Sequence, residues 1–252
     1  MADLSGKTAL VTGASKGIGA AIARRYAAAG ARVMVHYGTD NEGALAVLAS
    51  LDGEGHGTIQ ADVSHPEAIQ RMIDSTVAEF GSIDILVNNA GIYENQPFDM
   101  ESYDDWQTSW KRTIDTNLMS AANATHAAIA HMLPRGGGKI INVASRAAFR
   151  GETDAPAYAV SKAGMVSLTR CLARAMSPKG ILAYCIAPGW VETAMAREGM
   201  ETMAEEIVSQ IPLGRIASVE DVAGVALFFA SKDADYLTGT TMLVAGGSWL
   251  ST

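Results

Sequence analysis

Thr12-Gly13-Ala14-Ser15-Lys16-Gly17-Ile18-Gly19 is the stretch of sequence that decides the fold. It lies between a short apolar run and an alanine-rich stretch of helical length. A glycine-rich turn from a strand into a helix is typical of folds that bind a dinucleotide. Gly13 permits the tight turn, Gly17 lets the backbone approach a pyrophosphate, and Gly19 lets the helix pack closely against the sheet. The alternative is a turn whose glycines serve only packing.

Outward from this turn, short apolar runs alternate with stretches of helical length. Several runs are apolar at consecutive positions, as is typical of strands covered on both faces. Strands that alternate with helices form a parallel sheet with right-handed crossovers. The expected strands are Thr8–Thr12, Arg32–His36, Gly57–Ala61, Asp84–Val87, Lys139–Ala144, Ile181–Ala187 and Thr241–Val244. The expected helices include Ile18–Ala29, Glu67–Phe80, Asn117–Leu133, Ala157–Ala175 and Val219–Ala230. We predict an α/β fold, a three-layer doubly wound Rossmann fold with a seven-stranded parallel sheet.

The chain has the organisation of one domain. Its 252 residues suit a single α/β domain, and no linker, repeat or low-complexity tract divides them. We expect residues 1–252 to form a single Rossmann-type dinucleotide-binding and catalytic domain, with residues 190–213 as an excursion that contacts substrate. Residues 195–204 are rich in methionine, which fits either a lid of adaptable shape or a helix whose methionines pack into the core.

Charge and composition exclude several classes of partner. With 19 Lys and Arg against 27 Asp and Glu, the net charge is -8, so we expect no binding to nucleic acid or to a membrane surface. The N-terminus lacks the layout of a signal peptide, and no apolar run approaches the ~18 residues of a membrane span. We therefore expect a cytoplasmic protein. Cys171 and Cys185 lack metal-ligand spacing, which predicts no metal site and two buried reduced thiols.

Tyr158 and Lys162 form the first pair of candidate catalytic residues. They are four residues apart in a predicted helix, so the ammonium can approach the phenol. A nearby cation favours the phenolate and shifts the pKa of tyrosine toward the range useful for acid–base catalysis. Taken alone, however, Tyr-x-x-x-Lys also occurs on ordinary solvated helix faces.

Two further polar residues are expected at the same edge of the sheet. Ser145 directly follows a predicted strand, and Asn117 opens the helix predicted over Asn117–Leu133. A serine hydroxyl there can donate a hydrogen bond to a carbonyl oxygen that gains negative charge as hydride arrives. Taken singly, each is as well explained by a turn or a helix start.

The remaining motifs complete an ordered set. Asn88-Asn89-Ala90-Gly91, Asp62-Val63 and Pro188-Gly189-Trp190-Val191-Glu192-Thr193 each follow a predicted strand. Ser145 comes 28 residues after Asn117, and Tyr158 comes 13 residues after Ser145. Across essentially the whole chain, these motifs resemble the short, single-domain branch of the short-chain dehydrogenase/reductase family, including members described as 3-oxoacyl-(acyl-carrier-protein) reductases.

The resemblance implies a catalytic tetrad of Asn117, Ser145, Tyr158 and Lys162. Tyr158 would be the general acid or base, Ser145 would hold the substrate oxygen, Lys162 would bind the nicotinamide ribose, and Asn117 would support a proton relay. The implied cofactor contacts are Gly13, Ser15, Lys16, Gly17, Ile18, Gly19, Tyr37, Asp62, Val63, Asn89, Ala90, Gly91, Tyr158, Lys162, Pro188, Gly189, Val191 and Thr193. The expected substrate contacts are Ser145, Tyr93 and Trp190.

The cofactor preference depends on two positions. An NAD-selective site usually has an acidic residue at the end of the second strand, where this chain has Tyr37. Lys16, in the glycine turn, is well placed for the 2′-phosphate of NADP. Asp40 and Glu42 in the same loop oppose that phosphate. We expect NADP(H), with NAD(H) as the open alternative.

The function predicted from the sequence is an NADP-preferring oxidoreductase that interconverts a ketone or aldehyde and an alcohol. A 3-oxoacyl thioester is one candidate substrate. The alternatives are an NAD-linked alcohol dehydrogenase of the same family, a non-catalytic dinucleotide-binding regulatory protein, and an isomerase or dehydratase on the same fold. The expected partners are a small-molecule substrate and further copies of the chain, since the resemblance implies a homotetramer. Two arginines near the crevice, Arg146 and Arg150, could attract an anionic substrate, but we expect them to be solvated.

Overall fold

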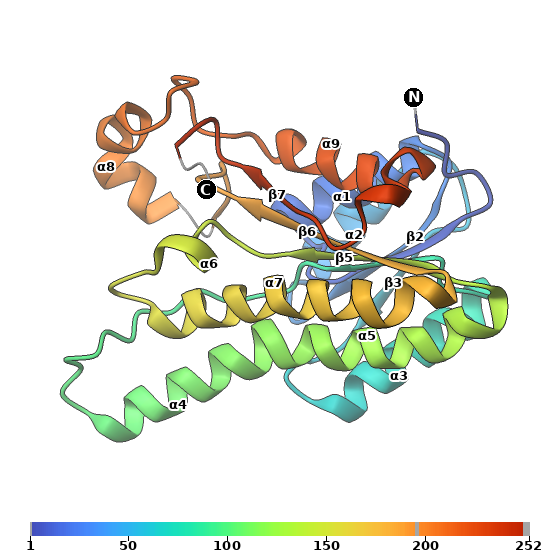
Figure 1. The fold of residues 1–252 in the computed structure, drawn as a ribbon, viewed down its shortest axis with the longest axis horizontal. Helices are drawn as coiled ribbons and strands as arrows, with labels where there is room; N and C mark the ends of the chain where they lie inside the picture. Colours follow the sequence, from blue (N-terminus) through green and yellow to red (C-terminus); the bar gives the residue numbers. More distant parts are fainter. Residues whose placement is uncertain (1, 195–196, 249–252) are drawn as a thin grey trace.

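The computed structural model describes residues 2–194 and 197–248, with only the backbone of residues 197–202. The described strands form one parallel sheet in the order β3-β2-β1-β4-β5-β6-β7 (Figure 1). The strands are β1 (Thr8–Val11), β2 (Arg32–Tyr37), β3 (Gly57–Gln60), β4 (Ile85–Asn88), β5 (Gly138–Val143), β6 (Ile181–Pro188) and β7 (Thr241–Val244). Each lies within one residue of its predicted bounds, and the predicted seven-stranded parallel sheet is confirmed.

The strand order reverses direction next to β1. From β1 the chain moves outward through β2 to β3, then crosses back to β4 on the other side of β1. In open parallel sheets the ligand crevice forms at this point, beyond the carboxyl ends of the strands. The turn after β1 and the loop after β4 therefore meet at one edge.

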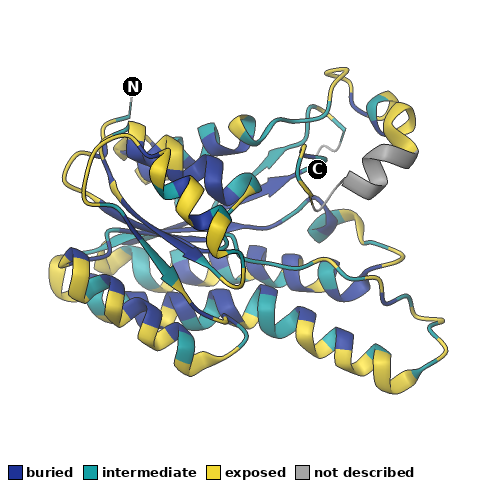
Figure 2. Ribbon diagram, turned by 180° about the vertical axis from the view of Figure 1, so that it is seen from behind, coloured by how far each residue is buried: buried dark blue, intermediate teal, exposed yellow. Residues whose placement is uncertain are grey.

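Helices cover both faces of the sheet (Figures 1 and 2). One face carries α1 (Gly17–Ala28), α2 (Asn41–Ala49) and α9 (Val219–Ala230), and its core includes Tyr26 and Phe229. The other face carries α3 (Pro66–Phe80), α5 (Ser120–Met132) and α7 (Pro156–Met176). The strands are largely buried between these layers, as their continuous apolar runs predict. The three-layer doubly wound architecture is confirmed.

The helices α2 and α4 (Tyr103–Ile114) are not among the predicted ranges, and neither is the short helix α6 (Ala147–Arg150). The helix α2 begins after Asp40, whose carboxylate accepts a hydrogen bond from the Gly43 N–H. The helix α4 begins after Ser102, whose hydroxyl accepts one from the Asp105 N–H. Both N-caps can be recognised in the sequence, because an Asp or Ser lies three residues before the residue whose backbone N–H it binds.

The prediction that Asn117 opens a helix is wrong. It lies inside a π-helical turn, η1 (Asp115–Met119), which joins α4 to α5 without a break. A π turn widens the helix by one residue and is common where a side chain serves a site. The side chain of Asn117 is bonded to backbone atoms of the loop after β4, and this long-range contact is absent from local sequence patterns.

Shorter elements complete the described chain. They are η2 (Leu133–Arg135), α6 (Ala147–Arg150), η3 (Ser177–Lys179), α8 (Arg197–Ser209) and η5 (Lys232–Leu237). The predicted excursion at 190–213 contains α8, which lies beyond the end of the sheet (Figure 1). Of its methionines, Met203 is 45% exposed and so is not packed into the core; Met195 lies outside the described residues.

Only one of the two thiols is buried. Cys185, in β6, is enclosed, whereas Cys171 is exposed on α7; both are free. The prediction for Cys171 is wrong because the buried stripe of α7 runs through Met165, Thr169 and Leu172. At 100° per residue, Cys171 falls to one side of that stripe.

Candidate active site

The glycine turn has the steric properties predicted for it. Gly13 and Gly17 have φ values of +63° and +58°, which side chains rarely adopt. A Cβ at Gly19 would lie 2.5 Å from the Gly13 carbonyl oxygen and 2.6 Å from Asn89 Nδ2. The first turn of α1 thus packs directly against the loops at the edge of the sheet.

His36 holds this turn in place, a role that sequence reasoning missed. Its Nδ1 accepts a hydrogen bond from the Gly13 N–H at 3.0 Å, and its Nε2 lies 3.1 Å from the Ala61 carbonyl oxygen. The ring is therefore neutral, with its proton on Nε2. It is 1% exposed, and burial lowers the pKa of His36. A histidine at the inward-facing end of the second strand is the signal that could have revealed it.

We expect the hydrogen bond between His36 and Gly13 to be lost in mild acid, and the fold to be less stable as a result. Because the pKa of His36 is lowered in the folded state, its neutral ring stabilises the fold fully above the unfolded value of about 6.5. The free energy of unfolding should fall as the pH drops below that value, since protonation removes the acceptor for Gly13. Urea unfolding at about pH 7.5 and about pH 5.5 checks this, compared with His36→Leu. The same pH dependence in both proteins would contradict it.

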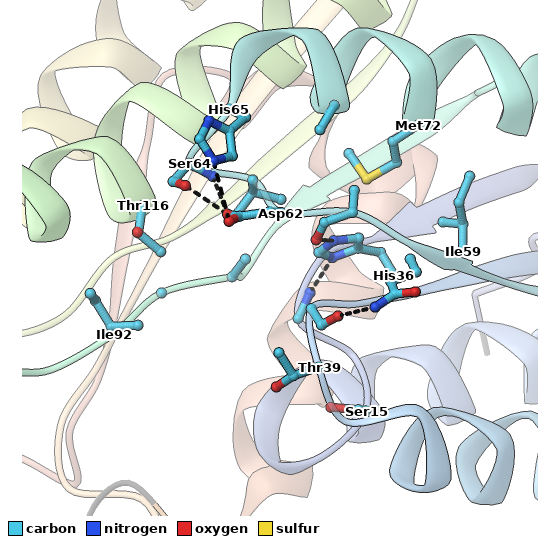
Figure 3. A pocket seen from close by; sticks show the side chains of 18 of the residues that line it. Ser15, His36, Thr39, Ile59, Asp62, Ser64, His65, Met72, Ile92 and Thr116 are labelled. Carbon is cyan, nitrogen blue, oxygen red and sulfur yellow. Dashed lines mark hydrogen bonds and ion pairs between the residues drawn. The ribbon is translucent and has the colours of Figure 1, made fainter.

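A large cleft opens beyond the carboxyl ends of β1 to β4. It has a volume of about 1380 Å³, and Figure 3 shows the side chains that line it. Seven of the predicted cofactor contacts lie on its walls: Gly13, Ser15, Lys16, Asp62, Val63, Ala90 and Gly91. The cleft is thus built from three loops far apart in sequence, as the resemblance implies.

The other predicted cofactor contacts lie around this cleft. Asn89 donates hydrogen bonds to the carbonyl oxygens of Thr12 and Gly13, which fixes the turn rather than facing the opening. Thr193 lies against the glycine turn, since a Cβ at Gly17 would be 3.5 Å from its Cγ2.

Further predicted contacts serve packing and strand ends. Ile18 and Tyr37 pack against the core. Pro188 ends β6, and the Gly189 N–H donates to the Val244 carbonyl oxygen. Val191 is buried and bridges to Ala217.

Charged groups in the cleft are held by local bonds. Lys16 Nζ lies 3.8 Å from an Asp40 carboxylate oxygen. Asp62 accepts hydrogen bonds from the Ser64 hydroxyl and backbone N–H, which lower the pKa of Asp62 (Figure 3). Lys16 and these fixed acceptors thus line the cleft together with Arg71 and Arg112.

Asn117 connects the loop after β4 to the helix α7. Its Oδ1 accepts from the Ile92 N–H at 2.8 Å, and its Nδ2 donates to the Ile92 carbonyl oxygen at 3.0 Å. Nδ2 also lies 3.1 Å from Ser161 Oγ, which donates in turn to the Tyr158 carbonyl oxygen at 2.7 Å. Ser161, which sequence reasoning missed, therefore couples Asn117 to the backbone of α7.

Tyr158 and Lys162 lie together as their spacing predicts. Lys162 Nζ is 5.6 Å from the centre of the Tyr158 ring and donates to the Val143 carbonyl oxygen at 2.9 Å. Burial lowers the pKa of Lys162 to about 8 and raises the pKa of Tyr158 to about 12, against the opposing interaction with the Ser145 hydroxyl. The expected lowering by Lys162 is not present: burial raises the pKa of Tyr158, and the Ser145 hydroxyl is the group that opposes this. The Tyr158 phenol is therefore protonated at neutral pH.

Of the predicted substrate contacts, Tyr93 lies against this pair and Trp190 lies against Arg146. The Tyr93 ring lies edge-on to the Tyr158 ring at 5.1 Å between centres. Trp190 lies beneath the Arg146 guanidinium, 5.3 Å from the ring centre. The expectation of a solvated Arg146 is wrong, since its side chain packs on Trp190 and is only 8% exposed; Arg150 is exposed as predicted.

Comparisons with known proteins agree with this geometry. The model of a family described as enoyl-(acyl carrier protein) reductase matches residues 13–248. The chain is 40% identical to 3beta-hydroxysteroid dehydrogenase 1 of Eggerthella lenta, over 98% of this chain and 95% of that protein. It is 37% identical to the 3-oxoacyl-(acyl-carrier-protein) reductase of Escherichia coli K12, over 98% and 99% of the two chains. The chain belongs to the short-chain dehydrogenase/reductase family.

The fold of this short-chain dehydrogenase/reductase is also similar to the folds of solved members of the family. A structure described as a short-chain alcohol dehydrogenase from Sinorhizobium meliloti 1021 superposes with a TM-score of 0.90 at 35% identity, covering 98% of this chain and 97% of that one. The chain is accordingly an oxidoreductase that acts on a CH–OH or C=O group. Among the described helices, none has the length and apolar character needed to cross a membrane. The described residues contain no cluster of metal ligands.

Proposed function

We propose that this protein is an NADP(H)-preferring carbonyl reductase in which Tyr158 is the general acid. The proposal is carried by the meeting of the Tyr158, Ser145, Lys162 and Asn117 side chains beside the glycine-lined cleft. The nicotinamide supplies the hydride when bound. The cleft fits such a group, because it has a volume of about 1380 Å³ and Gly13, Gly38 and Gly91 line it without side chains.

The residues of the chain perform the proton chemistry in this proposal. The Ser145 hydroxyl holds the carbonyl oxygen of the substrate, and the protonated Tyr158 phenol donates to that oxygen as negative charge develops. Lys162 holds a positive charge near the phenolate that forms. Asn117, tied to Ile92 and Ser161, keeps the loop and the helix in register. With a pKa of about 12 the Tyr158 phenol is protonated at neutral pH, which is the state that reduction requires of it.

The first experiment is a fluorescence titration of the purified protein with NADPH and, separately, with NADH. Tighter binding of NADPH supports the proposal and directs a screen of ketones and aldehydes for reduction. Tighter binding of NADH supports the NAD-linked alcohol dehydrogenase, and alcohols are then screened for oxidation. Binding of neither contradicts the cofactor assignment.

Lys16→Ala should weaken NADPH binding about tenfold and leave NADH binding nearly unchanged, because its ammonium lines the cleft beside the glycine turn, where the resemblance implies the 2′-phosphate. Lys16 is exposed, and among the described residues its one ion pair is with Asp40 at 3.8 Å, so the change should not unfold the protein. Lys7→Ala is the matched control, since Lys7 pairs with Asp84 at 3.7 Å and lies at the start of β1, the opposite edge of the sheet. An equal loss for both cofactors would contradict the phosphate contact.

We further propose that the chain works as one domain, in the cytoplasm and as a homotetramer, on a small molecule rather than a nucleic acid or membrane. Exposed aromatic side chains such as Phe98 (76%) and Tyr103 (68%) support association of copies, since such groups are commonly covered by a partner. Light scattering measures the number of copies. A 3-oxoacyl thioester remains one candidate substrate, as one relative bears that name.

A further inference from the structure

Arg146 has an unusual position for a charged side chain. It directly follows Ser145 and is only 8% exposed. Its backbone N–H donates to the Pro188 carbonyl oxygen, and its carbonyl oxygen accepts from the N–H groups of Phe149 and Arg150. The backbone is therefore fixed where the ends of β5 and β6 meet, beside the serine that is proposed to hold the substrate oxygen.

The guanidinium of Arg146 has no acceptor among the described residues. It forms neither a side-chain hydrogen bond nor an ion pair within that part of the chain; its one described aromatic contact is the Trp190 ring at 5.3 Å. Stacking uses the face of a guanidinium and leaves its five in-plane N–H donors available. None of the Arg146 nitrogens is among the fully enclosed polar atoms without a partner in the described residues, so these donors reach solvent, where a ligand can supply the acceptor.

The neighbouring charged side chains do not supply an acceptor for the Arg146 guanidinium. Glu152 lies close enough to raise the pKa of Arg146, but burial and Arg150 outweigh it and lower that pKa. Glu152 and Arg146 do not form an ion pair within the described contacts. The same glutamate raises the pKa of Tyr158 and Tyr93, so Arg146 shares one electrostatic environment with the groups around the reacting carbonyl.

We propose that Arg146 binds an anionic group of the substrate, so that the enzyme is selective for carbonyl compounds that carry a carboxylate. This inference deepens the proposed function and rests on it for the position of the reacting carbonyl. The planar fork of arginine binds a carboxylate through two parallel hydrogen bonds. Trp190 holds the fork in orientation, and Ser145 is the adjacent residue of the chain, so one substrate can reach both.

The test compares acids with their esters. The substrates are 4-oxopentanoate and 5-oxohexanoate, each beside its methyl ester, with the cofactor that binds tighter. The variants are Arg146→Met, which keeps an unbranched stem, and the matched control Arg150→Met, which removes one charge from an exposed position at the end of α6, the short helix that follows Arg146. We expect Arg146→Met to lower kcat/KM for the acids roughly 30-fold, with the esters and Arg150→Met changed by less than about threefold.

A binding experiment tests the inference without requiring catalytic turnover. Hexanoate and hexanamide are titrated by calorimetry into each protein, alone and with cofactor, after melting curves show that the variants fold. We expect hexanoate to bind more tightly than hexanamide, and this difference to disappear in Arg146→Met alone. Equal reduction of acids and esters by the wild type, with equal binding of hexanoate and hexanamide, would overturn the inference and leave the proposed function standing. Loss of hexanoate binding in Arg146→Met without reduction of any probe would support the anion site and count against the proposed function.

Discussion

Tyr158→Phe is expected to lower the rate of carbonyl reduction by about 10³-fold, the scale of losing a general acid, while dinucleotide affinity stays within about twofold of wild type. The substitution removes one hydroxyl and keeps the ring that packs against Tyr93 at 5.1 Å. The protonated phenol, with a pKa of about 12, is the group lost. Single-turnover rates with saturating cofactor measure the chemical step directly.

Tyr93→Phe provides the matched control for this measurement. It removes a hydroxyl from the neighbouring ring, which is 40% exposed, and should change the single-turnover rate by less than about tenfold. If Tyr158→Phe retained most of its activity, the assignment of Tyr158 as general acid would be wrong. Similar losses in both variants would instead point to disruption of the aromatic pair.

Gly19→Val is expected to weaken dinucleotide binding about 100-fold, because even a Cβ at this position overlaps the backbone. That atom would lie 2.5 Å from the Gly13 carbonyl oxygen and 2.9 Å from Ala14 Cα. Neither neighbour is a flexible side-chain end, so the turn itself must move away from α1. Isothermal titration with NADPH measures the loss, and a melting curve reports how much of it is global unfolding.

Gly38→Val separates the effect of this packing from the effect of adding bulk to the cleft. Gly38 also lines the cleft, but a Cβ there meets nothing within 4 Å. Its φ lies outside the left-handed region. We expect this variant to bind dinucleotide within about fivefold of wild type. If Gly19→Val bound as tightly as Gly38→Val, the close packing of the turn would be irrelevant to the site.

The architecture could be predicted from the sequence because its signals are local. A strand buried on both faces must be apolar at consecutive positions, and Ile140–Ile141 in β5 shows this directly. The glycine turn could also be predicted, since positive φ at Gly13 and close packing at Gly19 require glycine whatever surrounds them. The helix α4 was missed although its Ser102 cap is equally local.

The sequence by itself determined the seven strands, the glycine turn and the pairing of Tyr158 with Lys162, because each depends on neighbours along the chain. Only the tertiary structure decided that His36 fixes the turn, that Asn117 lies in a π-helical turn, and that Arg146 is buried on Trp190. It also set the pKa of Tyr158, which burial raises despite the nearby lysine. These properties depend on residues far apart in sequence that meet at one sheet edge. The desolvation of a titratable group at this edge depends on all the residues packed around it, and a local sequence pattern does not contain that information.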